Sequence, residues 1–300
     1  MNVFDTSKSF LQEIQLEEHS FTNIKLFAKR DDLIHPEVSG NKWRKLKYTI
    51  LKAKEQNKEG ILTFGGAFSN HLIATASACH LLKLKSVGVV RGDELSEFSN
   101  RNLARCKELD MDLIFLSRSE YKNRNEPTFS QIWQQRYSDL HFVPEGGANK
   151  EGIIGCAEIW NELKLPVDHI FVAQGTSTTS CGLAIGNTMR SKLHVVPTLK
   201  GYNSLSEMEA LLKNADYANK EINDALLNVV VHADGHAGGY AKSNEELLNF
   251  ICYCNDKYQL PLDSIYTGKA FYSLINWLKT QSFSTPQNIV FLHTGGLLNG

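Results

Sequence analysis

A glycine and an asparagine precede a lysine in the stretch Ser39-Gly40-Asn41-Lys42-Trp43-Arg44-Lys45-Leu46-Lys47-Tyr48. Leu46 and Ile50 are four residues apart, which predicts a helix that begins at the lysine. At such a loop-to-helix junction, backbone N–H groups favour anions, and the charges of Arg44 and Lys45 disfavour a third cation. A lysine with a lowered pKa can attack a carbonyl and form a Schiff base. The alternative is a basic first turn of a solvated surface helix.

A run of hydroxyl residues forms the second candidate site. The apolar strand 170–173 leads into Gly175-Thr176-Ser177-Thr178-Thr179-Ser180-Cys181-Gly182, and a helix is expected over 183–189. Backbone N–H groups and hydroxyls in such a turn suit a phosphate monoester. The turn lacks the lysine of a P-loop and the three-glycine dinucleotide fingerprint, so nucleotides are poor candidates. The alternative is a helix N-cap rich in serine and threonine.

Three further polar groups stand at predicted junctions. Ser69 and Asn70 follow a glycine turn and can bind a ring hydroxyl or a carboxylate, although Ser69 also suits a helix N-cap. Tyr266, which precedes an apolar helix, is a possible acid or base, whereas a packed tyrosine is commoner. The stretch 293–296, His-Thr-Gly-Gly, follows a strand, where open α/β sheets bind ligands.

Strands and helices alternate between residues 60 and 116, which predicts an open parallel sheet with helices on both faces. A strand is also expected over 22–29. Residues 117–137 are polar, and Pro127 argues against a continuous helix there. Residues 142–149 are expected to form a loop.

Composition narrows the function classes. The 300 residues are 42% hydrophobic and 22% charged with a net charge of −1, so neither nucleic acid nor a membrane is an expected partner. The first fifteen residues lack the apolar core of a signal peptide. Six scattered cysteines fit reduced thiols in the cytoplasm, and no metal site is expected.

A reactive lysine, a phosphate-binding turn and polar groups at strand ends together suit pyridoxal 5'-phosphate. The chain resembles the fold type II pyridoxal-phosphate enzymes, which are tryptophan synthase β-like, in the branch of D-cysteine desulfhydrase and 1-aminocyclopropane-1-carboxylate deaminase. The resemblance covers nearly the whole chain in family order. It rests on residues 29–32, 39–42 with 44–46, 69–70, 144–147, 175–176, 238–240, 266–269 and 293–296.

The resemblance implies the fold and the site. It implies two open, mostly parallel twisted sheets with helices on both faces and the cofactor between two domains. Residues 1–48 and 161–300 would form a large cofactor-binding domain, and residues 49–160 a small inserted α/β domain. Lys42, Ser69, Tyr240 and Tyr266 would act on the substrate, with Lys42 as the Schiff-base lysine and the base at Cα. The expected cofactor-binding residues are Lys42, Lys45, Asn70, Gly175, Thr176, Ser177, Thr178, Thr179, Thr267 and Thr294.

Two threonines bear on the reaction. By resemblance, deaminases carry Glu at position 267 and Leu at 294, whereas this chain has Thr267 and Thr294, as desulfhydrases do. A neutral environment at the pyridine nitrogen then favours β-elimination from D-cysteine, giving pyruvate, ammonia and hydrogen sulfide. The alternatives are aminocyclopropane-carboxylate deamination, dehydration of a D-serine-type substrate, and a non-catalytic amino-acid- or cofactor-binding protein. The expected partners are a small amino acid and a second copy of the chain in a homodimer.

Sequence also shows departures from the family. Trp43 replaces the small residue that follows the lysine in better-known members, and Ser177 and Thr178 stand where many members have glycine or alanine. The added side chains at 177 and 178 are expected either to bind phosphate or to crowd it.

Overall fold

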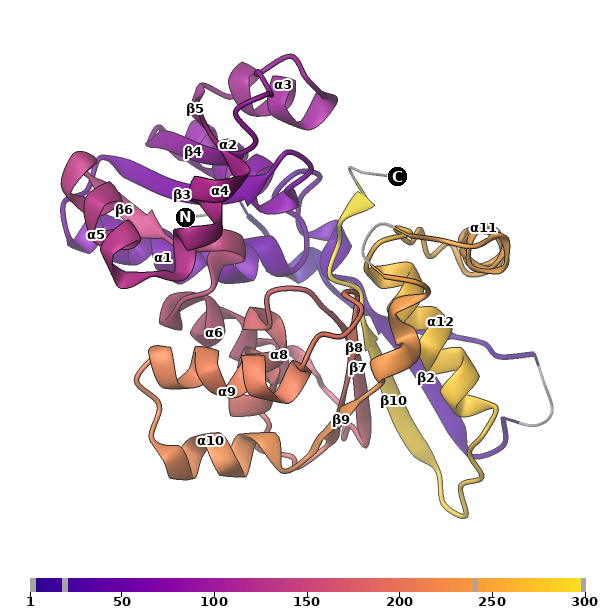
Figure 1. Ribbon diagram of the computed structural model, residues 1–300. Coiled ribbons are helices and arrows are strands. Elements are labelled where there is room, and N and C mark those ends of the chain that lie inside the picture. The colour runs from indigo at the N-terminus through magenta and orange to yellow at the C-terminus, as the bar shows by residue number, and fades with distance from the viewer. Residues whose placement is uncertain (1–3, 18–20, 240–241, 298–300) are drawn as a thin grey trace.

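Two sheets with helices on both sides build the molecule. The computed structural model describes residues 4–17, 21–239 and 242–297. Figure 1 shows the smaller sheet and the larger sheet as separate bodies of the fold, with helix α1 (Asn41–Glu55) between them. The predicted α/β class, with two mostly parallel sheets, is confirmed.

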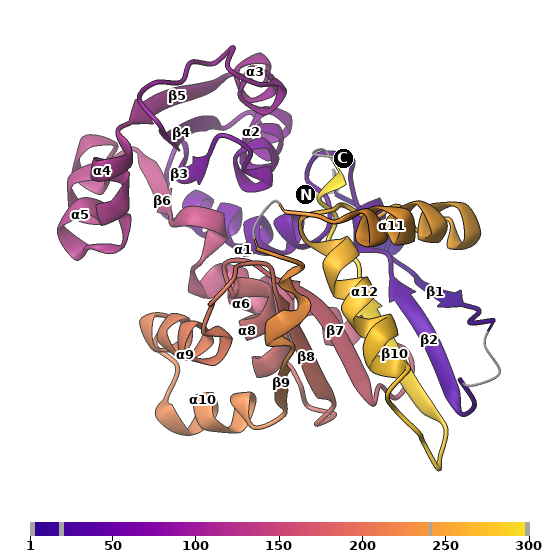
Figure 2. The same cartoon turned by 45° about the vertical axis from the view of Figure 1, so that its right-hand side comes forward.

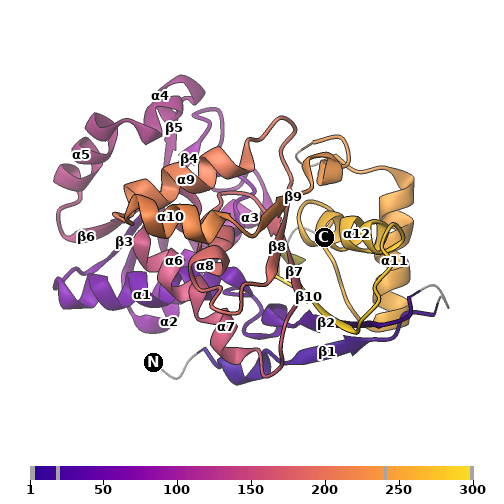
Figure 3. The same ribbon diagram turned by 90° about the horizontal axis from the view of Figure 1, so that it is seen from below.

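The larger sheet has the strand order β1-β2-β10-β7-β8-β9. Every neighbouring pair is parallel except β1 with β2, which is antiparallel. Helices α11 (Glu245–Tyr258) and α12 (Thr267–Leu278) cover one face (Figures 2 and 3). The other face is covered by α6 (Lys150–Ala157), α8 (Thr178–Ile185), α9 (Ser204–Asn214) and α10 (Asn219–Leu226). The strands are β1 (Leu11–Ile14), β2 (Ile24–Lys29), β7 (His169–Gln174), β8 (Lys192–Pro197), β9 (Val229–Val231) and β10 (Gln287–Leu292).

The smaller sheet has the order β5-β4-β3-β6 and is parallel throughout. Its strands are β3 (Gly60–Gly66), β4 (Lys85–Arg91), β5 (Met111–Leu116) and β6 (Leu140–Val143). The helices that follow in the chain are α2 (Asn70–Leu82), α3 (Arg101–Glu108), α4 (Arg118–Lys122), α5 (Pro127–Arg136), α6 (Lys150–Ala157), α7 (Ile159–Glu162), α8 (Thr178–Ile185), α9 (Ser204–Asn214), α10 (Asn219–Leu226), α11 (Glu245–Tyr258) and α12 (Thr267–Leu278). Short 3-10 turns are η1 (Thr6–Lys8), η2 (Asp31–Leu33), η3 (Asn123–Asn125), η4 (Glu145–Gly147) and η5 (Ala233–His236).

The apolar run of strand β7, residues 170–173, is uninterrupted because helices cover both faces of the sheet. Successive side chains of a strand point to opposite faces, and a parallel sheet is covered on both. Ile170 and Val172 pack in the core under α6 and α8, whereas Phe171 and Ala173 pack in the core under α12. Each residue of the run is therefore buried, although its neighbours in the chain lie in the opposite core.

The expectation that residues 117–137 form no continuous helix is confirmed. They contain two short helices, α4 and α5, and Pro127 occupies the first turn of α5, where its missing N–H costs nothing. Two other expectations about local structure were wrong. The loop expected from residue 142 begins with the last two residues of β6. Helix α8 starts at Thr178, inside the hydroxyl-rich turn, five residues before the predicted start. The domain boundaries at 48/49 and 160/161 stay a prediction.

None of the helices in the described part of the chain is long and apolar enough to span a membrane.

Candidate active site

Two glycine turns from opposite ends of the chain pack against each other and position Lys42. Gly40 has a φ of +59°, and a Cβ on it would stand 2.0 Å from the carbonyl oxygen of Thr294. A Cβ on Gly295 would likewise stand 2.1 Å from Oγ of Ser39. Only glycine permits these approaches. The start of α1 is thereby held against the carboxyl end of β10, with Lys42 as its second residue.

The pKa of the Lys42 amine is lowered toward physiological pH. Burial and the positive charge of Lys45 lower the pKa of Lys42 to about 8, against the opposing pull of Asp263. A neutral amine is the form that attacks a carbonyl. The prediction of a lowered pKa is therefore supported by the surroundings of this side chain.

The expected contribution of Arg44 to that shift was wrong. Its guanidinium donates to both carboxylate oxygens of Asp31, at 2.9 and 3.1 Å, and also pairs with Glu162. Lys29 completes the buried cluster with a 2.7 Å bond to Glu162. Burial opposes ionisation of Asp31, yet Arg44 and Lys29 hold the pKa of this carboxyl below its ordinary value. This cluster ties the first turns of α1 to η2 and α7, so Arg44 positions the helix.

Trp43 faces away from the site. It is buried and stacks on Phe4 with ring centroids 4.1 Å apart, in a core cluster with Val38 and Leu46. The large residue after the lysine thus fills a hydrophobic core and does not obstruct Lys42.

The hydroxyl-rich turn lies at the N-terminus of α8, where it is a candidate anion-binding nest. The first N–H groups of a helix lack acceptors within the helix, and this end carries a partial positive charge. Lys45 reaches the turn from α1, because its Nζ lies 3.4 Å from Oγ1 of Thr176 and donates to the carbonyl oxygen of Gly146 at 3.0 Å. Thr179 accepts a 2.8 Å hydrogen bond from Asn41. The nest therefore joins α1, η4 and α8.

The hydroxyls of the turn have different surroundings. The Ser177 hydroxyl accepts from Gln174 and pairs with the hydroxyl of Tyr202 at 2.9 Å, so it serves the packing of the turn. Ser177 also has a φ of +58°, which bends the chain into the helix. Thr178 donates to the carbonyl oxygen of Thr176 at 3.3 Å. Thr176 and Thr179 are the side chains of the turn that contact Lys45 and Asn41, so they are the candidates to hold a phosphate.

Ser69 and Asn70 begin α2 at the end of β3. Ser69 is the N-cap and accepts from the N–H of Leu72 at 3.4 Å. A Cβ on Gly296 would lie 3.6 Å from Nδ2 of Asn70, so this amide reaches the turn after β10. The N-cap alternative for Ser69 thus holds, and its hydroxyl keeps a hydrogen to donate.

His71 is a site residue for which sequence assigned no role. Its Nε2 bonds Oγ1 of Thr63 at 3.0 Å, and its ring edge lies close to Gly147. Burial and the charges of Lys45 and Lys42 lower the pKa of His71 to about 3, so the ring is neutral. The sequence could have identified His71 as a site residue, because it directly follows Ser69 and Asn70.

Tyr266 and Thr267 stand where α12 begins. A Cβ on Gly175 would lie 3.2 Å from Cε1 of Tyr266, so this ring covers the hydroxyl-rich turn. Tyr240 lies outside the described residues. Lys269, in the first turn of α12, donates to the carbonyl oxygen of Gly239 at 2.7 Å and ties that glycine to the helix.

A carboxylate lies where a neutral environment was expected. Asp263 is 2% exposed and accepts from the Thr267 hydroxyl at 2.5 Å. A Cβ on Gly296 would stand 3.3 Å from its Oδ2, so Asp263 lies between α12 and the turn that holds Thr294. The interpretation of Thr267 and Thr294 as a neutral pair was therefore incomplete. The sequence feature that could have predicted this contact is the aspartate four residues before Thr267, which begins the helix.

Several buried polar atoms in this region have no partner among the described residues: Oδ1 of Asn41, Nδ1 of His71 and Oγ of Ser180. Buried polar atoms are nearly always hydrogen-bonded, so these point to a polar ligand. Together with the lysine of lowered pKa and the phosphate nest, they fit pyridoxal phosphate, with Lys42 and the nest at its two ends. The assignment of individual residues to cofactor or substrate stays a prediction.

Comparison with known proteins supports pyridoxal phosphate as the cofactor. The family described as "Pyridoxal-phosphate dependent enzyme" matches residues 12–295. A bifunctional D-cysteine desulfhydrase/1-aminocyclopropane-1-carboxylate deaminase of Arabidopsis thaliana is 29% identical over 91% of this chain and 72% of its own length. A putative 1-aminocyclopropane-1-carboxylate deaminase of Thermotoga maritima is 28% identical over 97% of this chain and 94% of its own length.

Solved structures share the fold. The crystal structure of an ACC deaminase homologue superposes with a TM-score of 0.77 at 24% identity, covering 97% of this chain and 90% of the other. The chain therefore belongs to the pyridoxal-phosphate dependent enzymes, with that cofactor, in the group of 1-aminocyclopropane-1-carboxylate deaminases and D-cysteine desulfhydrases.

Proposed function

We propose that this enzyme is a lyase that eliminates the β-thiol of D-cysteine, so that D-cysteine and water give pyruvate, ammonia and hydrogen sulfide. The observation that carries the proposal is the residue at position 267. Thr267 presents a hydroxyl at the start of α12, and that hydroxyl already donates its hydrogen to Asp263.

Lys42 is the proposed base at Cα. With a pKa of about 8, more of its amine is neutral near neutral pH than for an ordinary lysine, and this neutral form can accept the Cα proton. When bound, pyridoxal phosphate supplies the electron sink that stabilises negative charge at Cα. We assign the phosphate to Lys45, Gly175 and the neighbouring Thr176 and Thr179.

The remaining residues orient the substrate in this proposal. Ser69, with a hydroxyl hydrogen free to donate, binds the substrate carboxylate or transfers a proton. Asn70 bonds the ring oxygen of the cofactor. Tyr266 covers the Gly175 turn, and with Tyr240 it flanks the amino acid.

The ring nitrogen separates the two reactions. A hydroxyl that donates to Asp263 can offer only lone pairs to the nitrogen, so the carboxylate acts through one intervening hydrogen bond. Such an acceptor supports a protonated nitrogen less than a carboxylate in direct contact, and it weakens the electron sink. β-Elimination tolerates a weaker sink because the thiolate departs with the electron pair. Opening a cyclopropane has no heteroatom leaving group and depends more on the sink.

The second candidate is deamination of 1-aminocyclopropane-1-carboxylate, and Asp263 favours it because its buried charge lies beside Thr267. A D-serine-type dehydratase remains within the same chemistry. A non-catalytic amino-acid- or cofactor-binding protein is the alternative from another class, and the lowered pKa of Lys42 argues against it.

The test is pyruvate or ketobutyrate release, expressed as kcat/KM, over D- and L-cysteine, D- and L-serine, β-chloroalanine and the cyclopropane substrate. We expect D-cysteine and β-chloroalanine to be preferred. Thr267→Glu with Thr294→Leu should lower elimination, whereas Thr267→Ser, which keeps the hydroxyl, should retain the preference. A wild-type preference for the cyclopropane substrate would refute the assignment.

We further propose that the enzyme is cytoplasmic, as its scattered free cysteines suggest, and that it forms a homodimer. Sedimentation equilibrium of the holoenzyme tests the oligomeric state, and fractionation of the source cells tests the location.

A further inference from the structure

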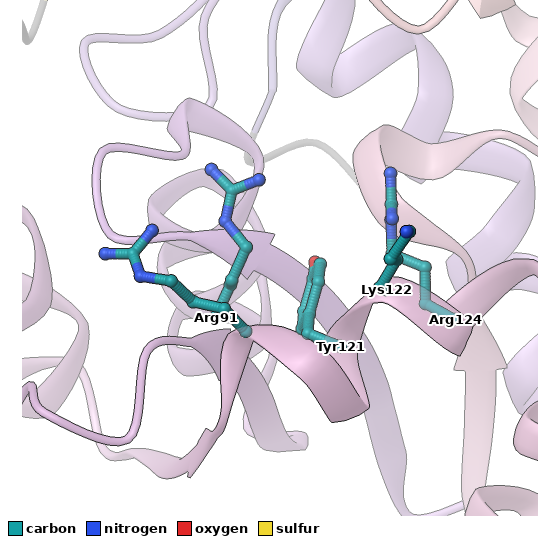
Figure 4. Close-up of a pocket in the computed structure, with 5 residues that line it drawn as sticks. Arg91, Tyr121, Lys122 and Arg124 are labelled. Atoms are coloured by element: carbon teal, nitrogen blue, oxygen red, sulfur yellow. The ribbon is translucent and has the colours of Figure 1, made fainter.

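A basic pocket of about 230 Å³ lies on the smaller sheet, lined by Arg91, Arg118, Tyr121, Lys122 and Arg124 (Figure 4). None of these residues belongs to the proposed cofactor site. Arg91 ends β4, and α4 with η3 follows the end of the neighbouring strand β5. The pocket therefore sits at the carboxyl edge of two adjacent parallel strands, where open α/β sheets bind ligands.

The pocket holds more positive charge than its acidic neighbours balance. Arg118 pairs with Glu94 and Arg124 with Glu145, each at 2.5 Å. Arg91 and Lys122 form no ion pair with any residue that the structure describes. Two positive charges are thus left for a ligand.

Tyr121 contributes a buried hydroxyl that lies near Glu145. The residue is fully buried, and its hydroxyl has no hydrogen-bond partner within the described ranges. Burial, the nearby charge of Glu145 and the interaction of the hydroxyl with that carboxylate raise the pKa of Tyr121, so the hydroxyl keeps its hydrogen. The Arg124 guanidinium lies 5.3 Å from the centre of the ring. Figure 4 shows the hydroxyl of Tyr121 and the charged ends of Arg91 and Arg124 pointing to the same side.

We propose that this pocket binds a phosphate group, as free phosphate or as the phosphate of a small monoester. Guanidinium groups bind phosphate oxygens through paired N–H donors, and the neutral tyrosine adds an O–H donor. A phosphate dianion matches the two unbalanced charges of Arg91 and Lys122. The cavity volume of about 230 Å³ is below that of pockets for drug-sized ligands and suits a small anion. This inference does not depend on which amino acid the enzyme cleaves.

Calorimetric titration of the holoenzyme tests the proposal, because bound cofactor already fills the other phosphate site. The probes are inorganic phosphate, glycerol phosphate and, as a dicarboxylate comparison, malonate. We expect one phosphate site per chain, with affinity lowered at least roughly tenfold by Tyr121→Phe and by Arg91→Gln with Lys122→Gln. The matched control is Lys107→Gln with Lys220→Gln, which removes two exposed lysines elsewhere and should leave the affinity unchanged.

Thermal unfolding separates a binding role from a structural one. Without phosphate, Tyr121→Phe should unfold at the wild-type temperature or above, because it removes a buried hydroxyl that has no partner. Phosphate should raise the unfolding temperature of wild type more than that of the variant. Tighter binding of glycerol phosphate than of phosphate would identify a monoester as the ligand, and equal binding would identify free phosphate. Absence of binding, equal binding by the variants, or malonate binding as tight as phosphate would overturn the proposal.

Discussion

Replacing Asp263 by asparagine tests the largest departure from the sequence interpretation. One carboxylate oxygen accepts from the backbone N–H groups of Ile265 and Tyr266, at 2.9 and 2.6 Å. The other accepts from the N–H and the hydroxyl of Thr267, at 2.9 and 2.5 Å. Asparagine has one such oxygen, so in Asp263→Asn an amide donor must face donors that are already in place.

The stability loss follows from this conflict. A buried N–H without an acceptor costs about 1–3 kcal/mol, and the surviving bonds lose the strength that the charge gave them, so we expect about 2–4 kcal/mol in total. Unfolding entropies near 2.1 cal/mol/K per residue amount to roughly 0.6 kcal/mol per kelvin for a chain of this length. The unfolding temperature of Asp263→Asn should therefore fall by about 3–6 °C.

The same variant changes the titration of Lys42. Asp263 opposes the burial and the Lys45 charge that bring the pKa of Lys42 to about 8, so its removal should lower this pKa further. The neutral amine then prevails at lower pH. The assay is the rate at which apoenzyme binds the cofactor covalently, measured at pH values on both sides of 8, and its midpoint should move to lower pH.

Asp224→Asn is the control, because Asp224 is exposed on α10. It should change neither the unfolding temperature nor the midpoint. If Asp263→Asn behaves like this control, or if its midpoint moves to higher pH, the electrostatic role assigned to Asp263 is wrong.

Three further variants test the cofactor site and its support. Lys42→Ala should bind pyridoxal phosphate only reversibly, and mass spectrometry after borohydride reduction should find no adduct; an adduct would place the reactive lysine elsewhere. Thr176→Ala with Thr179→Ala should weaken cofactor binding in spectroscopic titration, since each charge-assisted hydrogen bond contributes about 1.5–3 kcal/mol, and an unchanged dissociation constant would contradict the nest. Gly40→Ala should lower the unfolding temperature far more than Gly201→Ala, because both have positive φ but nothing lies within 4 Å of Gly201; equal losses would show that the contact with β10 does not matter.

Local signals in the sequence predicted much of the fold. The apolar run of β7 and the spacing of Leu46 and Ile50 fixed a strand and a helix, because these patterns depend only on residues close in the chain. Helices α9 and α11 went unpredicted, although Asn203 and Asn244 cap them by accepting from backbone N–H groups three residues on. That signal was present and local, so it could have been found.

Sequence by itself also determined the candidate cofactor, since Lys42 and the hydroxyl-rich turn carry recognisable chemistry wherever they lie. Tertiary structure decided how that chemistry is tuned. Arg44 is close to Lys42 in the chain, yet its guanidinium pairs with Asp31 and Glu162. Asp263 comes from the far end of the chain, and its charge opposes the lowering of the Lys42 pKa. A pKa and a close backbone contact depend on which distant segments meet, and sheet topology alone brings β10 beside the start of α1.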